Sequence, residues 1–433
     1  MPFRPPTIPW FGLLLCLSFL LSTGCGATTA PLTNEPAPST RQLTLWHSLS
    51  SEQAEILQGL ADEWSAQQST DVTVRLVRSP DEEALHQKLL AAIQTEMPPT
   101  LAFVRPADIA SYVDADALLP LDSLMEEGEN ALSEEEVADY YSEFFESSRY
   151  AASNDALYAW PVHRYQTLLF LNRTRILELG GEVPPPSWEA MVQVCAAHRQ
   201  QGGDTCMAAF PTGNIAVLWL WSHNGSVLDE KRLEPTFQGE AGQSVMQWLA
   251  ALRAVGGVHQ VPTYDAKVEA FVSGKTLFNF DSTAEIPTYE ARINSAFDMA
   301  VVPPPSTSGT PVTYATGGNV AIFRGDAESQ ALAWDFLRFW TSTESNYRWA
   351  AALDAYPVRR SALEKLDAEW PEFSRMRQAA EWLPYSRSEP MLALWPQIEK
   401  ILAEAMINTI NGQETPEQAL ETAARRVQGL LKP

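Results

Sequence analysis

The fold is decided by a stretch that begins with Leu43-Thr44-Leu45-Trp46-His47-Ser48-Leu49-Ser50. Its first four residues form a strand pattern. Ser50 and Gln53 then have the spacing of a capping box, which marks the start of a helix. Apolar residues follow at helical intervals, namely Leu57, Leu60, Ala61 and Trp64. The sequence therefore predicts a strand that leads directly into a helix.

The same order of elements repeats further along the chain. A second strand pattern covers residues 72–77, and a third covers residues 101–104. Between them, Ser79-Pro80-Asp81-Glu82 starts another helix, with proline at its first position. Strands that alternate with helices in this way predict an α/β fold, with a parallel sheet that carries helices on both faces.

The chain is too long for one core. About 390 residues follow the N-terminal leader, which is enough for two lobes. Strand patterns resume at residues 157–162 and 167–172 and return at residues 276–280 and 299–302. We assign residues 41–150 and 303–353 to lobe 1 and residues 151–302 and 354–433 to lobe 2, with crossings near 150, 303–311 and 354–357. Proteins of this kind bind ligands in the cleft between the lobes, where parallel strands present their C-terminal ends.

The first forty residues predict export. Arg4 precedes an apolar run at residues 11–21 that is too short to span a bilayer comfortably, so we interpret residues 1–24 as a signal peptide. Cys25 resembles the lipidated cysteine of a bacterial lipobox, although Ser22 stands where that motif usually has leucine. The alternative is ordinary cleavage nearby, with Cys25 incidental. Residues 25–40 are rich in Thr, Ala, Pro and Ser and are predicted to form a flexible linker to the lipid anchor.

Charge and motifs exclude several classes of function. The formal net charge of −24 disfavours nucleic acid as a partner, because binding phosphates requires clustered Lys and Arg. Ser273-Gly274-Lys275-Thr276 resembles part of a phosphate loop, but Glu269 replaces its first glycine. The motifs His-Glu-x-x-His and Gly-x-Ser-x-Gly are missing. We therefore predict no cofactor and no catalytic residues.

Two cysteines remain in the exported body after the leader. Cys195 and Cys206 flank a glycine-rich bend, and such a pair in an exported protein favours a disulfide. Zinc would need more ligands at close spacing, and only His198 is near. We predict the disulfide and no metal site.

Five segments carry a resemblance to a known family. In chain order they are Trp46-His47-Ser48; Leu169-Phe170-Leu171-Asn172 followed by Pro185-Pro186-Ser187-Trp188-Glu189; Phe271-Val272-Ser273-Gly274-Lys275 with Phe278-Asn279-Phe280-Asp281-Ser282; Gly317-Gly318-Asn319-Val320-Ala321-Ile322; and Ala355-Tyr356-Pro357-Val358. These segments resemble the extracellular solute-binding proteins of ABC importers, in the sugar-type cluster that includes maltose-binding and glycerol-3-phosphate-binding proteins. The resemblance extends over nearly the whole exported body.

The resemblance implies a two-lobed periplasmic-binding-protein fold of type II, each lobe a mostly parallel sheet flanked by helices, with extra C-terminal helices. It implies a monomer, lipid-anchored at the membrane on the periplasmic or outer cell surface, that closes over a sugar or polyol and delivers it to ABC permease subunits. The alternative within the same fold is a glycerol-3-phosphate or glycerophosphodiester binder. Rivals of another class are an exported glycoside hydrolase, which needs two carboxylates across a cleft, and a sugar-sensing lipoprotein.

Residues that follow strands, together with aromatic faces for sugar rings, are the predicted ligand contacts. They are Trp46, His47, Ser48, Arg105, Arg164, Tyr165, Trp219, Trp221, Asp281, Ser282, Gly317, Gly318, Asn319, Tyr356 and Arg387. For His47, a structural hydrogen bond at the strand end is an equal alternative. For Trp219 and for Trp221, a place in the core and a place in the site are equal alternatives. Arg105 departs from the glycerol-phosphate branch, where an acidic residue stands close by. It either meets an anionic group or pairs with a neighbouring Asp.

Overall fold

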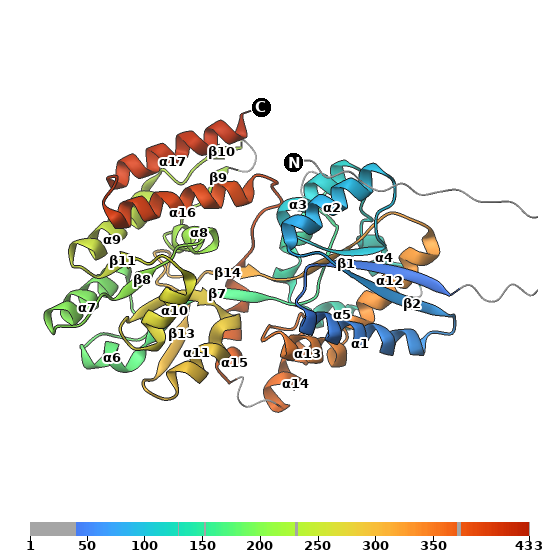
Figure 1. The fold of residues 1–433 in the computed structure, drawn as a ribbon, viewed down its shortest axis with the longest axis horizontal. Coiled ribbons are helices and arrows are strands. Elements are labelled where there is room, and N and C mark those ends of the chain that lie inside the picture. The colour runs from blue at the N-terminus through green and yellow to red at the C-terminus, as the bar shows by residue number, and fades with distance from the viewer. Residues whose placement is uncertain (1–39, 129, 151–152, 230–232, 370–373, 433) are drawn as a thin grey trace, which may run out of the picture. The chain divides into compact units, whose positions relative to one another are not determined.

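The computed structural model describes residues 40–432 except 129, 151–152, 230–232 and 370–373. Thr40–Pro433 forms one compact unit (Figure 1). The predicted signal peptide, Cys25 and all of the predicted linker before Thr40 lie outside the described residues. Within the described part, no helix has the length and apolar character needed to cross a membrane.

The first sheet is built around the stretch that opens the chain. Its strand order is β2 (Val72–Arg78), β1 (Arg41–His47), β3 (Leu101–Val104), β15 (Asn319–Ile322) and β6 (Trp160–Pro161). β1 pairs in parallel with β2 and β3, as predicted, while β15 runs antiparallel to both β3 and β6. Residues more than 150 positions apart in the sequence therefore complete one sheet.

Helices cover both faces of this sheet. Ser50 and Gln53 form the predicted capping box at the start of α1, which buries Leu57, Leu60, Ala61 and Trp64. Asp81 caps α2. The helices that belong with this sheet are α1 (Ser51–Gln67), α2 (Glu82–Gln94), α3 (Pro106–Asp114), α4 (Asp122–Glu126), α5 (Glu134–Asp139), α12 (Ala327–Trp340), α13 (Thr343–Ala352) and α14 (Arg360–Glu369), with the short turns η1 (Ser142–Phe144) and η2 (Glu146–Ser148). The apolar faces predicted from helical spacing are thus the buried ones.

The second sheet is mixed. Its order is β11 (Val258–Gln260), β8 (Met207–Ala209), β12 (Phe278–Ser282), β7 (Tyr165–Asn172), β14 (Thr313–Thr316) and β16 (Ser386–Arg387), and β13 (Met299–Val302) also pairs with β7. β12, β13 and β14 all run antiparallel to β7. These three strands therefore run in the same direction as one another and as β8, β11 and β16, and among the described strands of this sheet only β7 is reversed. The expectation of a mostly parallel sheet is thus confirmed, with one antiparallel strand inside the sheet.

The helices of the second sheet include the predicted C-terminal ones. They are α6 (Arg173–Glu178), α7 (Trp188–Gln200), α8 (Gly213–Ser222), α9 (Glu240–Ala254), α10 (Tyr264–Val272), α11 (Ile286–Ile293), α15 (Ser374–Ala380), α16 (Trp395–Asn411) and α17 (Pro416–Leu431). α16 packs against α8, α9 and α17. Thr415 and Gln418 form a capping box that starts α17. Short strand pairs complete the structure: β4 (Arg149–Tyr150) with β5 (Ala156–Leu157), and β9 (Leu228–Asp229) with β10 (Glu234–Pro235).

The chain passes between the sheets later than predicted. β6 belongs to the first sheet and β7 to the second, so the first crossing lies at residues 162–164 rather than near 150. β14 still belongs to the second sheet, so the next crossing lies at Gly317 and Gly318 rather than at 303–311. α14 packs on α13 and α15 on β13, which places the third crossing after 354–357. Nothing in the sequence marks the point at which the chain leaves one sheet and enters the other.

The two upstream crossings lie against each other at Gly317. A Cβ added there would stand 2.2 Å from the carbonyl oxygen of His163 and 2.8 Å from Cα of Arg164, and the φ of Gly317 is +151°. Only glycine adopts this backbone and leaves the space. The packing of the crossing thus requires glycine at this position.

We expect Gly317→Ala to lower the free energy of unfolding by about 2 kcal/mol or more, because the new methyl group clashes with rigid backbone. Gly325→Ala is the matched control, since an added Cβ there meets nothing within 4 Å. Its unfolding free energy should stay within about 0.5 kcal/mol of the wild type. Urea unfolding followed by circular dichroism measures both free energies. Equal stability of the two variants would show that position 317 does not require glycine.

Candidate functional site

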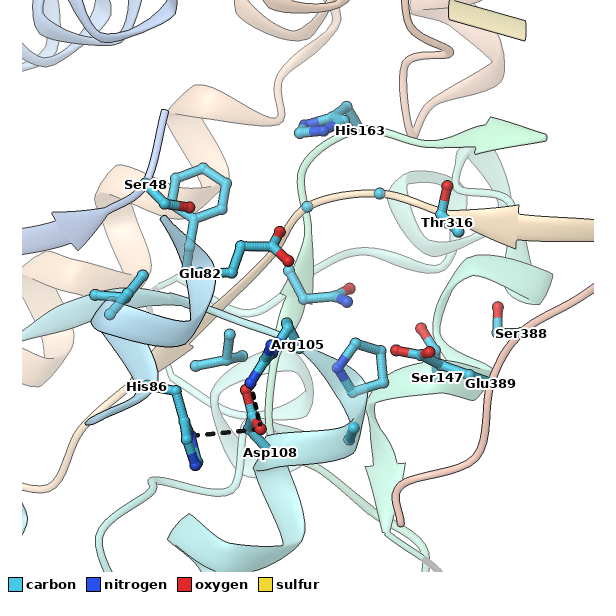
Figure 2. A pocket seen from close by; sticks show the side chains of 18 of the residues that line it. Ser48, Glu82, His86, Arg105, Asp108, Ser147, His163, Thr316, Ser388 and Glu389 are labelled. Carbon is cyan, nitrogen blue, oxygen red and sulfur yellow. Dashed lines mark hydrogen bonds and ion pairs between the residues drawn. The ribbon is translucent and has the colours of Figure 1, made fainter. Parts of the chain in front are cut away.

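A cavity of about 540 Å³ opens where residues of both sheets come together. From the first sheet, Ser48 follows β1, Glu82 begins α2 after β2, and Arg105 follows β3 (Figure 2). These positions are the carboxyl ends of three parallel strands, where α/β proteins place their binding residues. Thr316, at the end of β14, and Glu389, after β16, line the cavity from the second sheet.

Arg105 is held by carboxylates of the chain itself. Its Nε donates to Oδ2 of Asp108 at 2.6 Å, and its Nη2 donates to Oδ1 of Asp108 at 3.0 Å and to Glu83 at 3.1 Å. Burial, the largest single effect, lowers the pKa of Arg105, but the hydrogen bonds and negative charge of Asp108, together with Glu83 and Glu82, outweigh it and raise the pKa. Of the two alternatives left by the sequence, the structure contains the pairing with a neighbouring Asp.

A histidine and a tyrosine extend this network along the wall. Nδ1 of His86 lies 2.7 Å from the hydroxyl of Tyr112. It also lies 3.4 Å from Oδ1 of Asp108 (Figure 2). Near them, burial raises the pKa of Glu82, and Asp108 adds to the rise while Arg105 opposes it. The first-sheet wall therefore presents polar groups whose charges are largely matched by one another.

Arg164 lies at the crossing and is 1 % exposed. Its Nη1 donates to the carbonyl oxygens of His163 and Gly318, both at 3.0 Å. Its Nη2 donates to the carbonyl oxygen of Phe144 at 2.6 Å, to Oδ1 of Asn319 at 2.7 Å and to Oγ of Ser147 at 3.4 Å. None of these partners is acidic. Burial lowers the pKa of Arg164 to about 9, so the guanidinium keeps its charge at neutral pH.

His163 lies beside Arg164 in the cavity lining and is buried. Burial lowers the pKa of His163 to about 3, and the charge of Arg164 contributes. The ring is therefore neutral at neutral pH, and its Nδ1 accepts a hydrogen bond from the indole of Trp349 at 3.2 Å. His163 thus adds a polar but uncharged group to the cavity.

The second-sheet wall carries a tyrosine between two glutamates. The hydroxyl of Tyr314 lies 2.7 Å from Oε1 of Glu399 and 3.4 Å from Oε2 of Glu389. The ring of Tyr314 stacks on Trp221 at 5.1 Å, and the guanidinium of Arg387 lies 4.4 Å from the centre of the Trp221 ring. Aromatic packing therefore fixes the wall behind Glu389.

Seven of the predicted contact residues line the cavity. They are Ser48, Arg105, Arg164, Tyr165, Gly317, Gly318 and Asn319. Ser48 and Arg105 directly follow strands of the first sheet, and the other five lie at the crossings or begin the strands that come next, Tyr165 in β7 and Asn319 in β15. The structure thus brings together the residues predicted from strand ends.

The other eight predicted contacts lie outside the cavity lining, namely Trp46, His47, Trp219, Trp221, Asp281, Ser282, Tyr356 and Arg387. His47 is buried, and its Nδ1 accepts from the backbone N–H of Leu49, which is the structural alternative. Trp46 packs under the ammonium of Lys88. Trp219 is 1 % exposed and packs on Trp248 and Phe280, so it belongs to the core. Tyr356 is fully buried at the crossing.

Asp281 belongs to a buried polar network instead. Its Oδ2 lies 2.7 Å from Nζ of Lys267, and the hydroxyls of Tyr264 and Tyr289 donate to it. Burial lowers the pKa of Lys267, and Asp281 opposes this. Ser282 next to it caps the turn η4 (Thr283–Glu285). β12 ends away from the cavity, which sequence order alone does not reveal.

The sequence reasoning missed most of the polar lining. The missed residues are Gln53, Glu82, His86, Asp108, Tyr112, Ser147, His163, Thr316, Ser388 and Glu389. Glu82 could have been found, because it follows a predicted strand at a predicted helix start. Glu389 could not, because the strand before it is only two residues long and is defined by pairing with β14.

The predicted disulfide is not formed in the structure. Cys195 and Cys206 are both buried free thiols. Burial raises the pKa of the Cys195 thiol, and a hydrogen bond with Cys206 adds to the rise. The sequence placed the two side chains together correctly, but spacing does not decide the oxidation state of two neighbouring thiols. In the described part of the chain, no group of His, Cys, Asp and Glu is arranged to hold a metal ion.

Comparison with known proteins identifies the family. The profile described as "Bacterial extracellular solute-binding protein" matches residues 63–376. The chain belongs to this family. Its members bind small sugars or glycerophosphates outside the cytoplasm and work with ABC permeases. This solute-binding protein is accordingly not an enzyme.

Individual relatives agree on the fold and differ in their ligands. The sn-glycerol-3-phosphate-binding periplasmic protein UgpB of Pectobacterium atrosepticum is 21% identical over 446 residues, which cover 96% of this chain and 95% of that protein. The sugar-binding protein MalE of Xanthomonas citri has a TM-score of 0.76 and 18% identity, over 90% of this chain and 97% of that chain. UgpB of Mycobacterium tuberculosis, solved with glycerophosphocholine, has a TM-score of 0.71 and 17% identity, over 90% and 98%.

We expect Lys267→Met to lower the free energy of unfolding by about 3 kcal/mol, because it leaves the Asp281 carboxylate buried without its cation. The double variant Lys267→Met/Asp281→Asn should cost less than the sum of the two single variants. Denaturant unfolding of the four proteins gives the coupling energy. If the free-energy changes of the two single variants simply add up in the double variant, Lys267 and Asp281 do not form a stabilising pair.

Proposed function

We propose that this solute-binding protein captures a carbohydrate, a mono- or oligosaccharide, in the cavity and delivers it to an ABC permease. The proposal rests on how the charged groups of the lining are paired and protonated. Both arginines of the lining already donate to oxygens of the chain, and two carboxyl groups, Glu82 and Glu389, have raised pKa values. Such walls suit a neutral ligand rich in hydroxyl groups.

Aromatic side chains in the lining support the same proposal. Phe103, Tyr112 and Tyr165 line the cavity with hydrogen-bonding groups between them. Sugar rings pack their C–H faces on aromatic rings and place their hydroxyls on polar side chains. Among the lining residues that the structure describes, the aromatic faces are these three rather than the predicted tryptophans.

The second candidate is a glycerol-3-phosphate or glycerophosphodiester, which the names of several relatives favour. A phosphate binds best to a cation with free donors, in the way that Arg forms bidentate pairs. In this lining Arg105 is engaged by Asp108 and Glu83, and Arg164 by carbonyl oxygens. The charge pattern therefore favours the carbohydrate.

Capture in this proposal uses closure of the lobes. The cavity walls come from two sheets, and the chain passes between them at residues 162–164 and at Gly317 and Gly318. A ligand that contacts both walls stabilises the closed state relative to the open one. The permease then needs to recognise only the closed form.

Attachment to the membrane is part of the proposal. Cleavage after residue 24 and a lipid on Cys25 would leave residues 25–40 as a linker to the outer face of a membrane. The body then acts as a monomer near its permease, with no nucleic acid partner. Mass spectrometry of the protein purified from membranes should find the N-terminal peptide beginning at lipid-modified Cys25. An N-terminus elsewhere without lipid would contradict the anchor.

We expect sugars to raise the melting temperature of the purified protein in a thermal-shift screen that also contains polyols, sn-glycerol 3-phosphate and glycerophosphocholine. A ligand present at about 100 times its Kd contributes about 2.7 kcal/mol to stability. Stabilisation by the phosphates alone would support the second candidate. Turnover of glycosides would support the hydrolase rival, and a sugar response in cells that lack the permease would support the sensor.

We expect Glu82→Ala to weaken binding of the stabilising sugar by about tenfold, because the cavity loses a hydrogen-bonding group at a strand end. Gln94→Ala is the matched control on the same helix, since Gln94 is exposed and lies outside the lining. Calorimetry gives both affinities. Equal affinity of the two variants would remove Glu82 from the binding surface.

A further inference from the structure

One hydroxyl proton stands between two glutamates at the second-sheet wall of the cavity. The hydroxyl of Tyr314 lies 2.7 Å from Oε1 of Glu399 and 3.4 Å from Oε2 of Glu389. A phenol has a single proton to donate, and an ionised carboxylate can only accept. The shorter distance assigns the Tyr314 proton to Glu399, so Glu389 receives none from Tyr314.

Burial raises the pKa of Glu399 as well, but hydrogen bonds from Tyr314 and Trp395 oppose that rise, so Glu399 is the better place for the negative charge. It packs against the first residue of α8, where a Cβ added to Gly213 would lie 2.3 Å from Cβ of Glu399. The N-terminal end of a helix carries partial positive charge and favours an anion nearby. The indole of Trp395 lies 3.5 Å from the Tyr314 hydroxyl and donates to it, which strengthens the donation of Tyr314 to Glu399.

Glu389 faces groups from four other elements. Tyr314 comes from β14, Glu399 from α16, Glu82 from α2 and Arg105 from the end of β3. Two carboxyl groups in one site resist ionising together. Arg105 opposes their repulsion, but its donors are engaged by Asp108 and Glu83. Burial raises the pKa of Glu389 to about 8, and repulsion by Glu399 contributes.

We propose that Glu389 lies in the cavity as a neutral carboxylic acid at neutral pH and donates its proton in a hydrogen bond to an oxygen of the bound carbohydrate. This inference rests on the proposed function and adds a specificity-determining residue to it. A neutral acid both donates and accepts, as sugar hydroxyls do, whereas a carboxylate only accepts and attracts cations. Glu389 therefore selects oxygen-rich neutral ligands over ammonium ligands.

The protonation of Glu389 is tested first without any ligand. Infrared difference spectra recorded from about pH 5 to about pH 9 report the C=O stretch of protonated carboxyl groups. The wild type should lose a band as the pH rises through about 8, where Glu389 ionises. Glu389→Gln should lack this band. Glu417→Gln, which changes an exposed glutamate of α17, should keep it.

A second variant tests whether the titration of Glu389 depends on Glu399. Glu399→Gln removes the nearby negative charge, so the band of Glu389 should disappear at lower pH than in the wild type. A wild type without a protonated carboxyl band at neutral pH would overturn the proposal, and so would a band lost near pH 8 that persists in Glu389→Gln. An unmoved band in Glu399→Gln would show that Glu399 does not hold the proton on Glu389.

Binding of maltotriose tests the role of the proton. Between about pH 6 and about pH 9, the wild type should lose about tenfold in affinity, because ionisation of Glu389 removes the donor. Glu389→Gln carries a permanent donor and should keep its affinity over this range. A large loss in Glu389→Gln at about pH 6 would instead make the carboxylate an acceptor or a cation site.

The binding result separates this inference from the function that it extends. No binding of maltotriose to the wild type would count against the carbohydrate function, and the infrared titration would still decide whether Glu389 carries the proton. Binding with identical pH profiles in wild type and Glu389→Gln would leave the carbohydrate function standing and overturn the donor role of Glu389.

Discussion

The site depends on a buried cation that neutral oxygens hold at the crossing between the two sheets. Removing a guanidinium from water is costly, and Arg164 offsets that cost with hydrogen bonds to carbonyl, amide and hydroxyl oxygens. Those oxygens belong to η1, to Ser147 of η2, to both crossings and to β15. One side chain therefore fixes the floor of the cavity and the path by which the chain passes between the sheets.

Close packing at two glycines holds the two crossings against each other. Gly317 lies so close to His163 and Arg164 that no side chain fits, and Gly318 faces the rings of His163 and Phe103 in the same way. The glycine pair was recognisable in the sequence as part of a family segment. Its role at a crossing was not, because the partner strand lies about 150 positions away and leaves no local pattern.

Sequence patterns predict some of the residues that line the cavity and not others. Ser48 and Arg105 were predictable, because each follows a strand of a regular parallel series. Asp281 also follows a strand pattern, yet β12 ends inside a buried network with Lys267. Glu389 follows a two-residue strand that exists only through its pairing with Thr313 and Tyr314. Local periodicity therefore located the first-sheet wall, and tertiary pairing created the second.

The pairing of β15 with β3 also bears on how the chain folds. Ala102 lies opposite Ala321, about 200 positions further along, and contacts of such long range slow folding because the intervening loop must close first. The first sheet is thus incomplete until residues of β15 have been synthesised. Folding of the first sheet is therefore a late event during synthesis, after most of the chain has left the ribosome.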